Sequence, residues 1–287
     1  MTPRYLAITP ARDEQRFLPG LIASMRAQTI APQRWIIIDD ASTDCTGAII
    51  DEAARTTPWI EPHHLKSDRP RQAGGESVIM RFLTRDRWQD MDFIFRLDAD
   101  LSFGPDLVAL LLAEFERDPR LGIASPILAE PAGGGRWKDV ALRPMHTRGA
   151  AKMYSRACFE VVGKLEPELG WDVIDGVRAQ MAGFRTRTFS HIRCFHHRPQ
   201  GSAGGRLRGH YALGRSAWYV GYSPLFLLAA ALRRIAEPPF ALGSLMIIAG
   251  YLEGLVKRRP RVDDPDLIRF VRRQQRRRLL LMDSLWS

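Results

Sequence analysis

Short apolar runs alternate with amphipathic stretches along the first hundred residues. The runs Tyr5–Thr9, Trp35–Asp39 and Phe93–Leu97 predict strands, because each is short and mostly apolar. Between the first two runs, apolar residues at helical spacing, from Phe17 to Met25, predict a helix. This order is typical of βαβ units, so we expect an α/β fold with a mostly parallel sheet.

The same pattern continues to about residue 197. It predicts a helix over Asp106–Arg117 that begins after Pro105, and a later helix from about Asp172 to Ala182 that ends at Gly183. Further short strands are expected around Gly122–Ser125 and Arg148–Tyr154.

The charge pattern changes in the last third of the chain. The protein has 287 residues and a formal net charge of +10. Residues 1–197 carry 26 basic and 26 acidic side chains, whereas residues 198–287 carry 16 basic and 6 acidic ones. We therefore expect a catalytic-type α/β domain over residues 1–200 and a basic extension over residues 201–287, separated by a linker at Gly201–Gly205. A basic block after a neutral domain indicates a polyanionic partner, either nucleic acid or an anionic lipid surface.

Two strongly apolar stretches, Ala217–Leu232 and Phe240–Val256, lie in this extension. Each is shorter than the ~20 residues that span a bilayer, and Pro224 interrupts the first. Arginine and lysine residues follow both stretches, and amphipathic aromatic residues occur within them: Trp218, Tyr219, Tyr222 and Tyr251. This combination favours helices that lie in the interface plane of an anionic membrane. The alternatives are packing on the first domain and a homo-oligomer interface.

The final stretch, Asp264–Trp286, has the pattern of a basic amphipathic helix. Nucleic acid is an unlikely partner, since no nucleic-acid-binding motif accompanies the basic residues, and lipid phosphate is favoured instead.

Cysteine use and the N-terminus concern the compartment. Cys45, Cys158 and Cys194 are far apart and form no Cys-x-x-Cys pair, which is typical of thiols in a reducing compartment. The N-terminus has no apolar stretch of signal-peptide length. We therefore expect a cytoplasmic protein that is peripheral on the inner face of the cell membrane.

The first candidate chemistry is the pair Asp98 and Asp100, directly after the predicted strand Phe93–Leu97. Two carboxylates one residue apart at a strand end can share a hard divalent cation, and oxygen ligands favour Mn²⁺ or Mg²⁺. Asp-x-Asp alone also occurs in solvated turns and helix caps.

Two further polar clusters follow predicted strands. Asp39-Asp40 follows Trp35–Ile38, where Asp40 can accept hydrogen bonds from a base or ribose. The segment Thr9–Glu14 stands where a dinucleotide-binding fold would place its glycine fingerprint, and its sequence argues against a nicotinamide or flavin oxidoreductase.

Taken together, these clusters and their order resemble the inverting glycosyltransferases of family 2, which have a GT-A fold. The resemblance covers residues 4–197. It implies that Pro10, Arg12 and Glu14 lie beside the nucleotide, that Asp40 binds the base, and that Asp98 and Asp100 serve the diphosphate and its metal.

Inverting transfer needs a general base, and Asp172 is the candidate. The family places an acidic residue before the base and a helix ending in Gly-aromatic-Arg after it. Here Gly183-Phe184-Arg185 keeps that register, whereas Trp171 departs from the acidic residue. Asp172 can equally be a helix N-cap, and Asp175 is the alternative base.

Several basic residues and histidines are candidates for the diphosphate, the acceptor or the metal. Arg148 and Lys152 can face phosphates, and Gly149 between them permits close backbone approach to a sugar. After the last predicted strand, His196 or His197 can complete a metal shell and Arg198 can neutralise a leaving diphosphate. A surface strand and structural histidines are the alternatives.

These observations predict a metal-dependent glycosyltransferase that uses a nucleotide-sugar donor, with UDP-sugar favoured. By the resemblance, the acceptor is a lipid-linked glycan, on a polyprenyl-diphosphate carrier, in bacterial polysaccharide synthesis. The Gln-x-x-Arg-Trp motif of processive synthases is absent from the sequence, which favours addition of a single sugar. The alternatives are a catalytically silent scaffold of a glycan-assembly complex and a sugar nucleotidyltransferase.

Overall fold

The computed structural model describes residues 3–66, 88–140, 144–162, 170–198, 205–236 and 239–286. Its strands are β1 (Tyr5–Ala11), β2 (Arg34–Asp39), β3 (Ile60–His64), β4 (Phe93–Leu97), β5 (Leu101–Phe103), β6 (Leu121–Pro131), β7 (Trp137–Asp139), β8 (Ala151–Ser155) and β9 (Arg185–His196). Its helices are α1 (Leu18–Arg26), α2 (Thr46–Thr56), α4 (Leu107–Arg117), α5 (Arg156–Val162), α6 (Trp171–Met181), α7 (Arg206–Tyr219), α8 (Pro224–Arg233), α9 (Ala241–Val256) and α10 (Pro265–Leu279).

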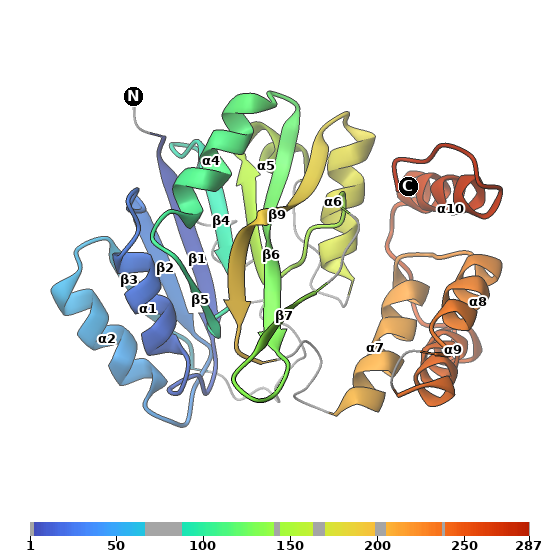
Figure 1. The fold of residues 1–287 in the computed structure, drawn as a ribbon, viewed down its shortest axis with the longest axis horizontal. Coiled ribbons are helices and arrows are strands. Elements are labelled where there is room, and N and C mark those ends of the chain that lie inside the picture. The colour runs from blue at the N-terminus through green and yellow to red at the C-terminus, as the bar shows by residue number, and fades with distance from the viewer. Residues whose placement is uncertain are drawn as a thin grey trace.

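The strands form one sheet in the order β3-β2-β1-β4-β8-β6-β9-β5, with β7 paired to β6 (Figure 1). The predicted α/β class is confirmed, and the three predicted N-terminal strands correspond to β1, β2 and β4. The expectation of a mostly parallel sheet needs a correction. The pairs β1–β2, β2–β3, β1–β4 and β6–β9 are parallel, whereas β4–β8, β6–β8, β6–β7 and β5–β9 are antiparallel. The parallel βαβ pattern thus holds as far as β4, and antiparallel strands extend the sheet beyond it.

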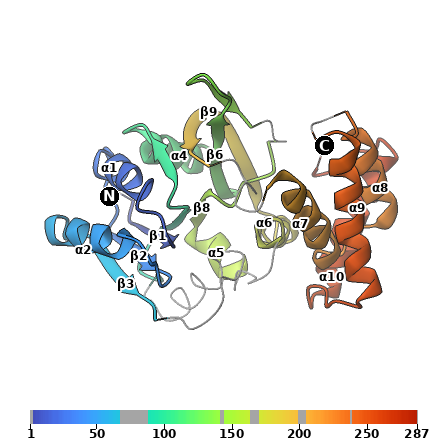
Figure 2. The ribbon, with the colours of Figure 1, turned by 90° about the horizontal axis from the view of Figure 1, so that it is seen from below.

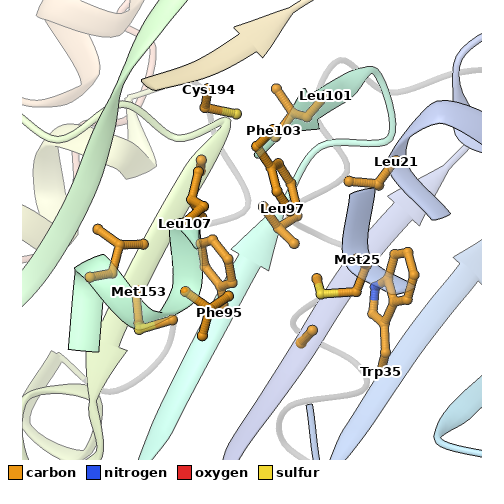
Figure 3. Close-up of a cluster of buried hydrophobic side chains, with 14 of the residues drawn as sticks. Leu21, Met25, Trp35, Phe95, Leu97, Leu101, Phe103, Leu107, Met153 and Cys194 are labelled. Atoms are coloured by element: carbon orange, nitrogen blue, oxygen red, sulfur yellow. The ribbon is translucent and has the colours of Figure 1, made fainter. Parts of the chain in front are cut away.

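Strand alternation sends successive side chains to two separate cores. In β1, Tyr5 and Ala7 pack with α1, α2 and α4, whereas Leu6 and Ile8 pack with α5 and α6. Figure 3 shows part of the first core. Trp35 and Met25 lie on one side of Phe95, and Met153 lies on the other side of it. Since both faces of the sheet are covered, its strands read as continuous apolar runs.

The C-terminal helices form a layer beside α6 (Figures 1 and 2). Ile174 and Val177 of α6 share an apolar cluster with Leu267 and Val271 of α10 and with Trp286. Trp286 also donates from Nε1 to Oε1 of Gln180 at 3.0 Å. The extension is therefore packed on the first domain, while the expected boundary at residue 200 and most of the expected linker lie outside the described residues.

The interface-plane role expected for the aromatic residues is wrong for two of them. Trp218 and Tyr251 are buried, with Trp218 Nε1 donating to the Arg259 carbonyl and the Tyr251 hydroxyl donating to the Tyr222 carbonyl. They pack inside the extension because α7, α8 and α9 enclose a small apolar core of their own. None of the helices in the described ranges combines the length and hydropathy that a bilayer-spanning segment needs.

Helices α7 and α9 cross in close contact because glycines line the crossing. A Cβ added at Gly214 of α7 would lie 2.0 Å from the Ile247 carbonyl oxygen, and one added at Gly250 of α9 would lie 2.1 Å from the Tyr211 carbonyl oxygen. Neither backbone can yield without separating the helices, so only glycine fits at these two positions.

This crossing predicts a large difference between two helical glycines. Gly214→Ala should destabilise the fold by about 1–3 kcal/mol, the usual cost of overpacking a close contact. Gly20→Ala in α1, where a Cβ would meet nothing within 4 Å, should be neutral or slightly stabilising because alanine favours helix. Thermal unfolding of the two variants measures this difference, and equal melting temperatures would contradict the close crossing.

Candidate functional site

The loops after β1 and β2 are held together by hydrogen bonds between side chains and backbone. Asp13 N–H donates to Ser42 Oγ at 3.0 Å, Thr43 N–H donates to Asp13 Oδ1 at 2.8 Å, and Glu14 N–H donates to Thr46 Oγ1 at 2.7 Å. Asp13 has a positive φ of 54°, a conformation in which aspartate is among the better tolerated residues. These bonds place the two polar clusters predicted from the sequence side by side.

The adjacent acids Asp39 and Asp40 have different roles in this loop pair. Asp39 is buried, accepts from Ser42 N–H at 2.9 Å and lies 3.1 Å from His64 Nδ1. Asp40 is half-buried and forms an ion pair with Arg12 at 3.5 Å. Asp40 and Arg12 therefore lie together at the carboxyl ends of β1 and β2, just beyond the pairs Pro10–Ile38 and Ala11–Asp39.

The pair Asp98 and Asp100 lies at the end of β4, as predicted, and β9 brings His196 to it. One ligand atom each from Asp98, Asp100 and His196 lie within 4.8 Å of one another. Antiparallel pairing of Leu101 with His196 explains the proximity, because it aligns the start of β5 with the end of β9. His196 Nε2 lies 3.3 Å from Asp100 Oδ1.

Electrostatics at this cluster favour the charged forms of Asp100 and His196 despite their burial, but not that of Glu14. Burial opposes ionisation of Asp100, but the hydrogen bonds from His196 and Arg198 hold the pKa of Asp100 below its usual range. Burial would lower the pKa of His196, yet the nearby carboxylates of Asp100 and Glu130 raise it to about 9. Burial raises the pKa of Glu14 to about 7, against the lowering effect of Arg198.

The chemistry of these residues fits a divalent cation. Two carboxylate oxygens and an imidazole nitrogen are ligands that Mn²⁺ accepts. Among the described residues, Glu14 Oε2 is a buried oxygen without a hydrogen-bond partner, and the charges of Asp98 and Asp100 act on this carboxyl group. Asp98, Asp100 and His196 can therefore hold a metal ion, and Glu14 adds a third carboxyl group near it.

His197 does not join this cluster, so the expectation that it is a metal ligand is wrong. Its Nε2 lies 2.8 Å from Ser102 Oγ, and its ring stacks on Phe17 and meets the edge of Trp137. His197 lies just beyond the end of β9, and it contacts Asp100 through its backbone N–H while its ring lies against Ser102 and Phe17.

Arg198 lies at the cluster as expected, but its guanidinium is engaged by acids. It donates from Nε to Asp100 Oδ2 at 2.8 Å and also donates to Glu14. The side chain thereby joins the loop after β1 to the end of β4. A guanidinium has five N–H donors, so these two bonds leave others for the proposed contact with a leaving diphosphate.

Asp172 lies in the first turn of α6, next to the segment Arg148–Ala150. The left-handed Gly170 precedes the helix, with φ of 104°, and the Asp172 side chain is half-buried. Asp98 N–H donates to the Ala150 carbonyl at 2.8 Å, while a Cβ added at Gly149 would lie 3.3 Å from Asp172 Cβ. The same short segment therefore contacts both the Asp-x-Asp pair and the candidate base.

The reason for Gly149 differs from the expected one. A Cβ there would lie 2.6 Å from Trp171 Cζ2, so glycine is needed at this position to leave space for the indole ring. The neighbouring Arg148 is half-buried, and burial lowers the pKa of its guanidinium while Glu130 and Asp172 act in the opposite direction. Arg148 thus remains a cation beside Asp172 that fits an anionic ligand.

Lys152 does not face a phosphate, which corrects the second basic prediction. It is fully buried, and Nζ donates to both oxygens of Asp175 at 2.8 and 2.9 Å and to the Asp172 carbonyl at 2.7 Å. All three of its N–H groups are therefore used inside the protein. Asp175, the alternative base, is equally buried and also accepts from the Tyr154 hydroxyl, so it too is part of the core.

Sequence reasoning missed Arg96, a buried cation within β4. It forms an ion pair with Asp98 at 2.8 Å and donates to the Gly149 carbonyl. Its guanidinium lies 4.9 Å from the centre of the Trp171 ring, and Lys152 Nζ lies 5.2 Å from it. The available signal was a single arginine in the apolar run Phe93–Leu97, two residues before Asp98. We refer to Arg96, Trp171, Lys152 and Asp175 as the buried cation network.

Residues 6–163 match the family model described as Glycosyl transferase family 2. The chain belongs to glycosyl transferase family 2. That assignment agrees with the Asp-x-Asp pair at the end of β4, and the fold is GT-A. A search of the curated proteins finds no match.

Solved structures agree in fold. A mannosyltransferase from Pyrobaculum calidifontis, PcManGT, in complex with GDP-Man and Mn²⁺, matches with a TM-score of 0.58 and 17% identity, over 89% of this chain and 76% of that one. S. aureus TarS 1–349 matches with a TM-score of 0.55 and 14% identity, over 87% and 70%. GalNAc-T7 with UDP, GalNAc and Mn²⁺ matches with a TM-score of 0.54 and 14% identity, over 82% and 51%.

The two histidines provide a matched test of the metal site. His196→Gln and Asp100→Asn should each weaken Mn²⁺ binding about tenfold or more, since each removes a ligand. His197→Gln should leave the affinity unchanged, because that imidazole contacts Ser102 and aromatic rings. Calorimetric titration with Mn²⁺ alone measures all three. Equal losses in the two histidine variants would contradict the assignment of His196.

The buried pair Lys152 and Asp175 provides a stability test. Lys152→Met should cost about 3–5 kcal/mol, because it leaves a buried carboxylate without its cation. The double variant Lys152→Met with Asp175→Leu should recover a large part of this loss, since neither charge then remains. Urea denaturation compares the two, and a double variant as unstable as the single one would argue against the ion pair.

Proposed function

We propose that this protein transfers a sugar from a nucleoside-diphosphate sugar to an acceptor hydroxyl with inversion at the anomeric carbon. The proposal depends on one observation in this family 2 chain. The segment Gly149–Ala150 contacts both Asp98 and Asp172, so the candidate metal site at Asp98 and Asp100 lies next to the candidate base Asp172.

The donor nucleotide is proposed to lie over the carboxyl ends of β1, β2 and β4. Parallel strands of open α/β sheets bind ligands at this edge. Asp40 would accept hydrogen bonds from the base, with Pro10 and Arg12 beside it, and Glu14 and Asp98 would lie nearer the diphosphate. Similar structures were solved with GDP-Man, UDP-GlcNAc and UDP, which supports a nucleotide-sugar donor, and a UDP-sugar is our first choice.

A divalent cation, Mn²⁺ or Mg²⁺, held by Asp98, Asp100 and His196 would neutralise charge on the diphosphate. The residues of the chain account for the rest of the site. Arg198 is anchored on Asp100 and Glu14, and Arg148 is a half-buried cation near Asp172. These arginines would bind phosphate oxygens of the donor or of an anionic acceptor.

Asp172 is proposed as the general base. The acceptor oxygen attacks the anomeric carbon, the bond from that carbon to the diphosphate oxygen breaks, and the acceptor proton passes to the Asp172 carboxylate. The nucleoside diphosphate leaves with the electron pair of the broken bond. Lys152 holds the Asp172 carbonyl at 2.7 Å, so the buried cation network would fix the start of α6 and with it the position of the base.

The acceptor is proposed to be a lipid-linked glycan, on a polyprenyl-diphosphate carrier, at the inner face of a bacterial cell membrane. The basic extension beside α6 supports this choice, as does the similarity to TarS from a bacterium. The product would belong to cell-surface polysaccharide synthesis. A silent scaffold would also fit the fold, but it would not need an acid cluster with a neighbouring carboxylate.

Asp172→Asn tests the base. It should lower turnover by about 10²- to 10⁴-fold, the usual contribution of a general base, while leaving nucleotide affinity unchanged. UDP and GDP binding with Mn²⁺ is measured by calorimetry, and release of nucleoside diphosphate from a panel of UDP- and GDP-sugars measures turnover. The matched control is Asp106→Asn, an exposed acid before α4.

The outcomes separate the parts of the proposal. If the protein binds one of the two nucleotides and Asp100→Asn does not, the result supports the donor site and identifies the nucleobase of the donor as uracil or guanine. Full turnover in Asp172→Asn would remove Asp172 from the mechanism. Binding of neither nucleotide would overturn the UDP- or GDP-sugar donor and favour the scaffold.

A further inference from the structure

The outer surface of the extension carries an exposed apolar face. On α9, apolar residues that recur at helical spacing are exposed: Leu242, Leu245, Leu252, Leu255 and Val256. On the neighbouring α8, the exposed residues are Leu225, Leu228 and Leu232. We call these eight residues the outer apolar face. Val256 is 79% exposed and Leu225 is 66% exposed, so the described part of the chain leaves the face largely uncovered.

Packing within the described part of the chain does not account for this face. The opposite side of α9 already packs on α7 through its glycines and Ile247. Figures 1 and 2 show α8 and α9 on the side of α7 that lies away from the sheet. Exposed apolar residues that recur along one face of a helix in this way mark an interaction site.

Cations flank the outer apolar face at both ends. Ser244 Oγ donates to the Ala231 carbonyl near the start of α9, and the Tyr251 hydroxyl donates to the Tyr222 carbonyl near its end. Helices α8 and α9 are therefore antiparallel. Arg233 and Arg234 end α8 at one end of the pair, and Lys257, Arg258 and Arg259 follow α9 at the other, all of them exposed.

The single acid of α9 does not change this balance. Hydrogen bonds from Lys257 and Arg259 lower the pKa of Glu253 to about 2, so its charge is matched locally by cations. The face thus consists of apolar side chains between two positively charged ends.

This charge arrangement decides between the two candidate occupants. In a two-fold dimer through this face, each cationic end would meet a cationic end of the second copy, whether the helices aligned parallel or antiparallel. An anionic bilayer instead offers acyl chains to the leucines and negative headgroups to both ends at once.

We propose that the outer apolar face docks the protein on an anionic membrane surface, with the leucines of α8 and α9 inserted among the acyl chains. Docking in the interface plane requires no spanning helix. The inference deepens the proposed function and rests on it only in supposing that the acceptor is presented at that membrane. Docking itself needs neither donor nor acceptor.

The test measures co-sedimentation of the full chain with vesicles of phosphatidylcholine, with and without phosphatidylglycerol. Wild-type protein should bind the anionic vesicles. Leu245→Glu with Leu252→Glu should reduce the partition about tenfold or more, because two exposed leucines no longer enter the acyl region. Arg233→Gln with Arg258→Gln should reduce it about fivefold for each cation removed.

Matched controls lie on the first domain. Leu110→Glu exchanges a 42% exposed leucine of α4, and Arg120→Gln removes an exposed cation, and neither should change vesicle binding. Thermal unfolding of every variant shows whether it is folded. Since all the substituted side chains are exposed, their melting temperatures should stay close to that of the wild type.

Each outcome is decisive. Equal binding by the leucine variant and its control, or no binding of wild type to anionic vesicles, would overturn the proposal. A dimer in size-exclusion chromatography that Leu245→Glu with Leu252→Glu dissociates would overturn it in favour of a second copy. Vesicle binding without any binding of UDP or GDP would keep the docking surface and reject the proposed function instead.

Discussion

The interaction on which the site depends is the pair of buried cations around the Trp171 ring. Arg96 comes from β4 and Lys152 from β8, two strands in the middle of the sheet, while Trp171 begins α6. Arg96 holds Asp98, and Lys152 holds the Asp172 carbonyl and Asp175. Two charges that would be costly to bury alone are thus satisfied by acids, carbonyls and an aromatic face. Because the network joins the candidate metal site to the candidate base Asp172, we expect a disturbance of either cation to displace both.

The sequence predicted those parts of the protein that depend on local pattern. Apolar runs identified β1, β2 and β4, and the position of Asp98 and Asp100 after such a run identified the acid pair, because a strand end exposes whatever follows it. The register of β9 against β5, which selects His196 over His197, depends on long-range pairing, so both histidines remained candidates. Lys152 was misjudged for a related reason. The burial of Lys152 depends on its ion pair with Asp175, which lies in α6. The residues next to Lys152 in the sequence do not indicate that partner.

Trp171 shows how a departure from the family pattern is accommodated. The resemblance implies an acid before the candidate base Asp172, whereas this chain has the indole of Trp171 there, and Asp175 lies one turn further along the same helix. The carboxylate of Asp175 reaches Lys152 from that turn. The Trp171 ring packs against the cationic groups of Arg96 and Lys152. Asp175 therefore supplies the negative partner of Lys152, and Gly149 provides the space that the indole ring needs.

The glycine crossing of α7 and α9 divides α9 into two sides with opposite tolerance to sequence change. On the inner side, Gly250 and Gly254 face backbone or ring atoms so closely that no side chain can be added. On the outer side, any residue of suitable polarity fits, since nothing in the described chain packs against it. Mutational drift in this helix is therefore confined to one surface. The extension can adapt to a different environment by exchanging outer residues alone, without altering the contacts that hold α7 against Gly170 at the start of α6.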